Sequence, residues 1–317
     1  MLSRAAGVTT RLISHMAPPL ASWIALDKSK DEPTAMIEFR SVTKKFPDGT
    51  VAVDDFSLTM PSHETTVLVG SSGCGKTTIL RMINRMVDAT AGQVLIDGED
   101  VANRDKVQLR RSIGYVLQAA GLLPHRHVVD NVATVPILNG TPKAQAREDA
   151  LELLDKVGLD RSLAHRYPRQ LSGGQQQRVG VARALASDPN ILLMDEPFGA
   201  VDPIVRADLQ AELGRLQSEL GKTIVFVTHD IEEAFALADT VVIFRKGGKI
   251  AQKGTPAEIL ANPADEFVET FIGADKARRR LRLEQATEGG TIVVDGDGRV
   301  AGVLDDDARS TRGDAVS

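Results

Sequence analysis

The feature that most constrains this chain is a glycine-rich segment joining a β-rich run to a helical one. Gly70-Ser71-Ser72-Gly73-Cys74-Gly75-Lys76-Thr77 fits the pattern G-x-x-x-x-G-K-[ST]. It follows an apolar run that ends at Val69, and a helical pattern begins at Lys76. Glycines let the backbone turn tightly, so its N–H groups point at phosphate oxygens and the helix N-terminus adds to the attraction. The pattern predicts a phosphate-binding loop in an α/β domain.

Two side chains at the end of this loop have distinct expected roles. Lys76 is expected to reach the β- and γ-phosphates of a nucleotide, and the Thr77 hydroxyl to bind Mg²⁺, which prefers hard oxygen ligands. We interpret Cys74 as a tolerated small residue, because no motif assigns it a base. The residues expected to contact nucleotide in this part of the chain are Gly70, Ser71, Ser72, Gly73, Cys74, Gly75, Lys76, Thr77 and Thr78.

β-rich runs and helical patterns alternate from residue 36 to about residue 273. The runs at 191–194, 224–227 and 241–244 are unbroken and apolar, which is typical of strands covered on both faces of a mainly parallel sheet. Apolar residues at helical spacing lie between the runs and predict core-facing helices, for example Ile79, Met82, Ile83, Met86 and Val87. The sequence therefore predicts an α/β fold.

Composition excludes several classes of protein. Thirty-eight Lys and Arg against 43 Asp and Glu give a net charge of −5, which excludes a nucleic-acid binder that works by bulk positive charge. The single cysteine, Cys74, excludes an internal disulfide and suits a reducing compartment. No apolar run reaches the ~18–20 residues needed to span a bilayer. We expect a chain whose membrane role, if it has one, is peripheral.

A pair of carboxylates follows the apolar run 191–194. Asp195 at the end of that strand is expected to lie beside the phosphate loop and to hold Mg²⁺ directly or through water. Glu196, one residue on, is the natural general base for polarising a water against the γ-phosphate. Adjacent acidic residues are common in loops. The predicted role of this pair therefore depends on the buried strand that precedes it and on the phosphate loop upstream.

The segment Leu171-Ser172-Gly173-Gly174-Gln175-Gln176-Gln177-Arg178 allows two interpretations. Ser172 and the two glycines offer a hydroxyl and backbone donors at a helix start, which makes an anion site. A capped helix with a glycine-rich entry explains the same residues equally well. The residues alone leave both interpretations open.

With this segment included, residues 36–273 resemble an ATP-binding-cassette (ABC) ATPase. The resemblance implies a P-loop NTPase fold of the ABC type, with a mainly parallel sheet core, an antiparallel β subdomain and a helical subdomain at about 119–180. It implies that Ser172 and Gly174, with Gly173 and Gln175, clasp the γ-phosphate of ATP held by a second subunit. Two subunits would then close over two nucleotides as a homodimer.

The same resemblance implies roles for four further residues. Gln118 is similar to a glutamine that senses Mg²⁺ and the attacking water, and His229 to a switch histidine that contacts the γ-phosphate. Asp202 matches a loop that crosses the dimer interface. Phe46 has the place of an aromatic residue that stacks on adenine, where Tyr is more usual. The implied catalytic set is Glu196, His229, Lys76 and Gln118, and the implied metal set is Thr77, Gln118 and Asp195.

The segment from Ala119 to Pro136 resembles importers of quaternary-ammonium osmoprotectants such as glycine betaine, choline, carnitine and proline betaine. This implies an ATPase subunit at the cytoplasmic face of the plasma membrane, paired with membrane permease subunits and an extracytoplasmic substrate-binding protein. Two alternatives stay open. One is an importer of another small polar solute, such as an amino acid, sulfonate or polyamine, and the other is a non-transport ATPase clamp.

The two ends of the chain differ from its middle. Residues 1–35 end in a polar string and predict a disordered leader, with Met36 as an alternative start. In the tail, 274–317, basic residues from Lys276 to Arg282 crowd a helical-looking segment, which is interpreted as a solvated helix face or as a contact for anionic lipid. A hairpin pattern at 291–304 then resembles a single CBS-type hairpin.

Overall fold

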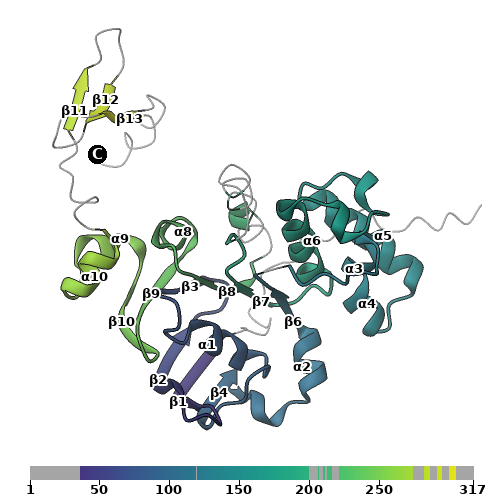
Figure 1. Ribbon diagram of the computed structural model, residues 1–317, viewed down its shortest axis with the longest axis horizontal. Coiled ribbons are helices and arrows are strands. Elements are labelled where there is room, and N and C mark those ends of the chain that lie inside the picture. The colour runs from purple at the N-terminus through teal and green to yellow at the C-terminus, as the bar shows by residue number, and fades with distance from the viewer. Residues whose placement is uncertain are drawn as a thin grey trace, which may run out of the picture. The chain divides into compact units, whose positions relative to one another are not determined.

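The computed structural model contains two β-sheets with their covering helices, a group of helices and a short C-terminal sheet (Figure 1). It describes residues 36–118, 120–199, 206, 210, 213–215, 221–273, 282–285, 291–294 and 300–304. The expected leader at 1–35 lies outside these residues, as do Asp202 and the basic residues from Lys276 to Arg280. No helix within the described ranges is long and apolar enough to cross a membrane.

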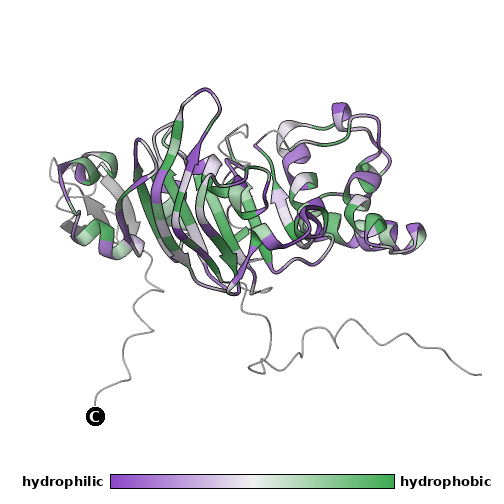
Figure 2. Cartoon of the chain, turned by 90° about the horizontal axis from the view of Figure 1, so that it is seen from below, coloured by the Kyte–Doolittle hydropathy of each residue, from purple (hydrophilic) through white to green (hydrophobic). Residues whose placement is uncertain are grey.

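A six-stranded sheet forms the centre of residues 36–273. Its strand order is β10-β9-β3-β8-β7-β6, parallel throughout except for the antiparallel edge strand β10. Every residue of β3, β7 and β8 is buried, as the unbroken apolar runs predict for β7 and β8, and Figure 2 shows many hydrophobic residues along the strands of the sheets. The strands are β3 (Thr65–Gly70), β6 (Ile113–Val116), β7 (Ile191–Asp195), β8 (Thr223–Thr228), β9 (Thr240–Arg245) and β10 (Lys249–Gly254).

Parallel pairing brings the carboxyl ends of the central strands to one edge of this sheet. Val69 pairs with Thr228 in the β3–β8 ladder, and Asp195 pairs with Val227 in the β7–β8 ladder. Ligands of open α/β sheets bind at this edge, outside the carboxyl ends of the strands. The register thus places the phosphate loop, the acidic pair at the end of β7 and His229 after β8 at the same edge of the sheet.

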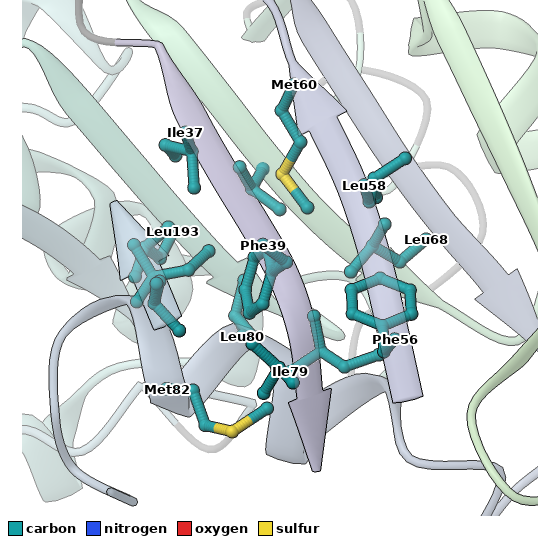
Figure 3. Packing of buried hydrophobic residues seen from close by; sticks show 14 of the residues in the cluster. Ile37, Phe39, Phe56, Leu58, Met60, Leu68, Ile79, Leu80, Met82 and Leu193 are labelled. Atoms are coloured by element: carbon teal, nitrogen blue, oxygen red, sulfur yellow. The ribbon is translucent and has the colours of Figure 1, made fainter. Parts of the chain in front are cut away.

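A four-stranded antiparallel sheet, ordered β2-β1-β4-β5, packs with the helix α1 (Lys76–Ile83) against the central sheet. Phe39 and Phe56 of this sheet meet edge to face at 5.2 Å, in the same cluster as Ile79 and Leu80 of α1 and Leu193 of β7 (Figure 3). The helix is therefore held from both sides, which also fixes the end of the loop that leads into it. The strands are β1 (Ile37–Lys45), β2 (Val51–Met60), β4 (Ala91–Ile96) and β5 (Glu99–Asp100).

The helices α3–α6 share a hydrophobic cluster of their own, which includes Val129, Leu154 and Val179. They occupy much of the range 119–180 expected for a helical subdomain, and α6 continues to Leu185, where it packs on the central sheet. This group is seen beyond β6 in Figure 1. The helices are α3 (Val128–Val132), α4 (Thr134–Leu138), α5 (Lys143–Lys156) and α6 (Gly173–Leu185).

Shorter elements complete the described part of the chain. They are the 3₁₀ turns η2 (Val101–Asn103), η3 (Arg161–Leu163) and η4 (Pro168–Gln170), and the helices α2 (Lys106–Ser112), α8 (Ile231–Leu237), α9 (Pro256–Ala261) and α10 (Glu266–Phe271). Asp230 is the N-cap of α8, and its side chain accepts the N–H groups of Glu232 and Glu233.

The helical stripe expected to run to Val87 is shorter than predicted. Helix α1 ends at Ile83, Arg85 has a φ of 54°, and Met86 is 51% exposed. The side chain of Asn84 accepts the N–H of Met86 at 3.1 Å, which is the local hydrogen bond by which asparagine ends a helix. Met86 is consequently outside the core.

The C-terminal hairpin pattern is present as β12 (Thr291–Val294) and β13 (Val300–Leu304), which pair antiparallel. A third strand, β11 (Arg282–Gln285), pairs with β12. The prediction of a helical segment reaching Arg282 is therefore wrong, because Arg282 pairs with Val294 in the strand ladder. At Arg282, pairing with another strand overrides the local helical pattern.

Candidate nucleotide-binding site

The phosphate loop spans from the end of β3 at Gly70 to the first residue of α1, Lys76. Gly75 has a φ of 108°, and a Cβ atom built on it would lie 2.6 Å from the carbonyl oxygen of Ala52. A Cβ on Gly70 would lie 2.8 Å from the carbonyl oxygen of Phe244. Backbone from β2 and from β9 thus approaches the loop too closely for any side chain at these two positions.

Lys76 is almost fully buried in this loop. Its ammonium donates to the carbonyl oxygens of Gly70 at 2.7 Å and Ser71 at 3.0 Å, and lies 3.6 Å from the sulfur of Cys74. A buried ammonium is costly unless it is hydrogen-bonded, so these carbonyls hold the charge at the loop. Cys74 is 1% exposed and belongs to the core cluster that supports α1.

Thr77 and Asp195 meet across the edge of the sheet. The Thr77 hydroxyl donates to Oδ1 of Asp195 at 2.9 Å, although the two residues lie 118 positions apart. Asp195 is 4% exposed. The structure therefore brings together the two oxygen-bearing side chains that the sequence assigned to a magnesium site. A hydroxyl and a carboxylate are hard oxygen donors, and Mg²⁺ is usually held by one or two such protein groups together with phosphates and water. This donor set fits the ion.

The second oxygen of Asp195 has two partners that the sequence analysis missed. Arg81 Nη2 and the Tyr115 hydroxyl each lie 3.4 Å from Oδ2 of Asp195. Burial raises the pKa of Tyr115 above its usual range, so the phenol stays a donor at neutral pH. Arg81 lies five residues after Lys76 and Tyr115 lies in β6, and no local pattern links either to Asp195.

Glu196 lies between the two other residues assigned to catalysis. Gln118 Nε2 donates to Oε2 of Glu196 at 3.0 Å, and His229 Nδ1 lies 3.3 Å from Oε1. The structure thus brings Gln118 and His229 onto one carboxylate. The Gln118 amide is therefore placed at Glu196, and its expected metal role stays a prediction.

The backbone of Glu196 has an unusual conformation. Its φ is 46°, in the left-handed region, and its N–H donates to the carbonyl of Val227 at 2.9 Å. A non-glycine residue in this region costs free energy, and such residues cluster at functional sites. The strand neighbour β8 therefore holds Glu196 in a strained turn, one residue after the buried Asp195.

Phe46 is half-buried in the turn between β1 and β2. Its N–H donates to the carbonyl of Thr50 at 2.8 Å, and the ammonium of Lys44 lies 5.1 Å from the centre of its ring. The strand that leaves this turn carries Ala52, whose carbonyl faces Gly75 of the phosphate loop. Phe46 is thereby tied through β2 to the loop.

Ser172 is the N-cap of α6 and forms a capping box with Gln175. The Ser172 hydroxyl accepts the N–H of Gln175 at 3.2 Å, and the Gln175 side chain accepts the N–H of Ser172 at 3.0 Å. Ser172 and Gly173 are exposed. In the described structure, all recorded hydrogen bonds of Ser172 stay within its own helix start. The capped-helix interpretation thus describes what Ser172 does within one chain.

Comparison with known proteins identifies the family. The family model described as ABC transporter matches residues 53–199. The chain is 52% identical over 241 residues to the choline transport ATP-binding protein OpuBA of Bacillus subtilis, covering 76% of this chain and 63% of that protein. It is 48% identical over 246 residues to the glycine betaine uptake system ATP-binding protein YehX of Escherichia coli, covering 78% and 79%.

A solved structure agrees in fold. A bacterial ABC transporter cassette determined as a dimer matches with a TM-score of 0.65 and 35% identity, over 69% of this chain and 98% of that one. The expected ABC-type fold, a parallel core with an antiparallel sheet and helices, is confirmed. The chain spans 60–63% of the length of the first curated relatives that it matches. With this fold and these relatives, the chain belongs to the ABC transporter family of ATP-binding proteins.

Proposed function

We propose that this chain is the ATP-hydrolysing subunit of an importer for quaternary-ammonium osmoprotectants. The observation that carries the ATPase part is the Glu196 carboxylate held between Gln118 and His229, beside the Thr77–Asp195 pair. The substrate class is supported by the relatives, whose names include choline, carnitine and glycine betaine transport.

The phosphate loop supplies the binding half of this function. Lys76 carries a positive charge at the loop, and the first turn of α1 adds backbone donors, so both favour a triphosphate. Thr77 and Asp195 would hold Mg²⁺, and that ion supplies neutralisation of phosphate charge when bound. Phe46 is proposed to stack on the base. Tyr115 and Arg81 keep the Asp195 carboxylate in place.

Glu196 is proposed as the general base. A carboxylate in this role must lie where it can accept a proton from water, and its orientation must be fixed before the reaction. The Gln118 amide donates to one oxygen, and the His229 imidazole lies beside the other, so both fix the carboxylate plane. In phosphoryl transfer such positioning, with the surrounding charge, does most of the catalytic work.

A second copy of the chain is proposed to complete each nucleotide site. Ser172, Gly173, Gly174 and Gln175 lie at an exposed helix start, where N–H groups and the helix dipole favour an anion. The matched cassette was solved as a dimer. We propose a homodimer with Asp202 at its interface, bound to membrane permease subunits at the cytoplasmic face and served by an extracytoplasmic substrate-binding protein.

The ATPase assignment is tested by Glu196→Gln. The amide cannot accept a proton, so turnover should fall by about 10²-fold or more, whereas ATP binding should be retained. Steady-state phosphate release and fluorescent-nucleotide binding measure the two. Glu99→Gln, which removes an exposed carboxylate in an ion pair with Arg104, is the matched control and should leave both unchanged. Normal turnover in Glu196→Gln removes Glu196 from the role of base.

The substrate assignment is tested by uptake in cells. A strain that carries the complete transporter with this chain should accumulate radiolabelled glycine betaine or choline, and the same strain with Glu196→Gln should not. Amino-acid, sulfonate and polyamine solutes form the comparison set. Uptake of one of these in place of the quaternary amines would assign the importer to another solute, and no uptake of any would favour a non-transport clamp.

A further inference from the structure

A partly buried network of hydrogen bonds and ion pairs involves both chain neighbours of His229, Thr228 and Asp230. Thr228 precedes the histidine and donates its hydroxyl to Oε2 of Glu233 at 2.6 Å. Asp230 follows the histidine, and its N–H donates to the same Thr228 hydroxyl at 3.0 Å. Arg206 Nη1 lies 3.4 Å from Oε1 of Glu233 and 3.7 Å from Oδ2 of Asp230. The four residues form a closed ring, which we call the histidine bracket (Arg206, Thr228, Asp230 and Glu233).

One acidic residue of the bracket is buried. Glu233 is 6% exposed on the first turn of α8, and burial raises the pKa of its carboxyl above the usual range. The Arg206 Nε atom is buried and has no hydrogen-bond partner among the described residues. Buried ion pairs with incomplete hydrogen bonding contribute little to stability, because desolvation offsets the attraction. The bracket therefore needs a reason other than stability.

The location of the bracket beside His229 provides that reason. Within the bracket, Thr228 and Asp230 are joined to each other by a hydrogen bond, which fixes the backbone on both sides of His229. Asp230 also caps α8, so the turn that carries His229 is tied to a helix start. His229 itself is 58% exposed at its side chain and touches Glu196 at 3.3 Å. An exposed side chain needs a fixed backbone to keep such a contact.

We infer that the histidine bracket positions His229 against Glu196, with Arg206 and Glu233 as positioning residues for hydrolysis. This inference rests on the proposed ATPase function. Arg206 is the one member of the bracket outside residues 228–233, and it lies four residues after Asp202. The bracket thus makes the placement of His229 depend on Arg206, a residue distant from it in the chain.

Two variants of the full chain test the bracket. Glu233→Gln keeps an oxygen that accepts the Thr228 hydroxyl but removes the charge facing Arg206. Arg206→Gln removes the cation and keeps the carboxylate. Each should lower kcat by about tenfold, with KM for ATP and binding of a non-hydrolysable analogue within about twofold, because only positioning is lost. The thermal midpoint should change by less than about 5 °C in Glu233→Gln, and should fall further in Arg206→Gln, which leaves the buried Glu233 carboxyl without its cation.

Histidine-ring NMR gives a readout that a merely structural role does not move. Six histidines give six sets of ring signals, and His229→Asn assigns the relevant one. Both variants should shift the His229 signal. The matched control is Arg147→Gln, which breaks the two-hydrogen-bond ion pair with Asp130 among the helices α3–α6 and should leave kcat and the His229 signal unchanged.

The possible results separate two kinds of failure. If the wild-type chain does not hydrolyse ATP, the proposed function is wrong. If the wild type hydrolyses ATP but kcat stays within about twofold in both variants, or falls without any shift of the His229 signal, the bracket has no positioning role. If Glu233→Gln does not fold, Arg206→Gln decides alone, because the Arg206 side chain is 32% exposed and its replacement opens no enclosed cavity.

Discussion

The phosphate loop and the start of α6 are both glycine-rich helix entries, yet they are built differently. The loop is closed in by backbone from β2 and β9, and its lysine is buried among carbonyl groups. At the start of α6, Ser172 and Gly173 are exposed, and in the described part of the chain Ser172 is hydrogen-bonded within its own helix start, through the capping box with Gln175. The phosphate loop is thus enclosed by backbone of its own chain, whereas the α6 start leaves Ser172 and Gly173 exposed. The difference is in keeping with the proposal that the α6 start contributes to a site shared between two copies.

The largest expected effect comes from a substitution in the phosphate loop. Gly75→Ala places a Cβ atom 2.6 Å from the Ala52 carbonyl at a φ of 108°, so the free energy of unfolding should fall by about 3 kcal/mol. Gly73→Ala is the matched control, since Gly73 has a φ of 76° but nothing within 4 Å of the added atom, and should cost only about 1 kcal/mol. Denaturant unfolding measures both. Equal losses at the two positions would contradict the tight enclosure.

The same change in the other region should be mild. Gly174 lies in the first turn of α6, and alanine favours the helix, so Gly174→Ala should alter the free energy of unfolding by less than about 1 kcal/mol. Turnover should nevertheless fall, because the added methyl group obstructs the proposed approach of a phosphate. Unfolding and phosphate release, measured on one preparation, separate these effects. A variant with full turnover would remove Gly174 from the shared site.

Ser172→Ala sharpens the comparison further. Loss of the cap should cost about 1 kcal/mol of stability, whereas loss of a γ-phosphate contact should lower turnover by about 10²-fold. Thr255→Ala is a matched control, because Thr255 forms the same kind of capping box with Glu258 at the start of α9. It should match the stability loss and keep full turnover. If both variants keep full turnover, Ser172 is only a helix cap.

A smaller effect is expected from a substitution at Tyr115, whose hydroxyl lies beside Asp195. Tyr115→Phe removes the hydroxyl that lies 3.4 Å from Asp195 but leaves Arg81 in place. Turnover at limiting Mg²⁺ should fall by about threefold, because a hydrogen bond of this length is weak even though its acceptor is a carboxylate. A titration of turnover against Mg²⁺ measures this. Tyr167→Phe, at the only other tyrosine of the chain, should leave the titration unchanged. An unaltered titration in Tyr115→Phe would show that Arg81 suffices.

The smallest expected effect concerns the pH dependence of the free energy of unfolding, to which Glu233 and Glu258 should contribute with opposite signs. Burial raises the pKa of Glu233, so its contribution is full below the usual carboxyl pKa and is lost as pH rises through the raised value. Hydrogen bonding from Thr255 lowers the pKa of Glu258, whose contribution is lost as pH falls. Relative to wild type, Glu233→Gln should gain stability from acidic to neutral pH and Glu258→Gln should lose it. Unfolding curves at a series of pH values test the two signs.

Much of the fold could be predicted from the sequence, because its signals are local. Unbroken apolar runs mark β7, β8 and β9, and the glycine-lysine loop marks the β3–α1 junction. The early end of α1 depended on an Asn84 side-chain bond that periodicity does not register. Arg282 lies in a strand because of its partner Val294. These two errors arise where a side chain or a distant strand overrides the local pattern.

The residues of the site also divide into those that the sequence predicts and those that it does not. The meeting of Thr77 with Asp195 follows from parallel strands, since their carboxyl ends share one edge. The proposed roles of Gln118 and His229 came from family resemblance, and the structure brings both onto Glu196. Arg81, Tyr115 and Glu233 could not be found from the sequence, because each acts through a contact between elements far apart in the chain. The role of Asp202 stays a prediction, outside the described residues.

The most direct measurement of the central claim is the ATPase rate per subunit as a function of subunit concentration, with the molecular mass recorded at each point. If two copies are needed to complete each nucleotide site, the rate per subunit should rise with concentration in step with the fraction of dimer. It should approach zero in the monomer. A constant rate per subunit in a strictly monomeric solution would contradict the account, because it would mean that one chain forms a complete site.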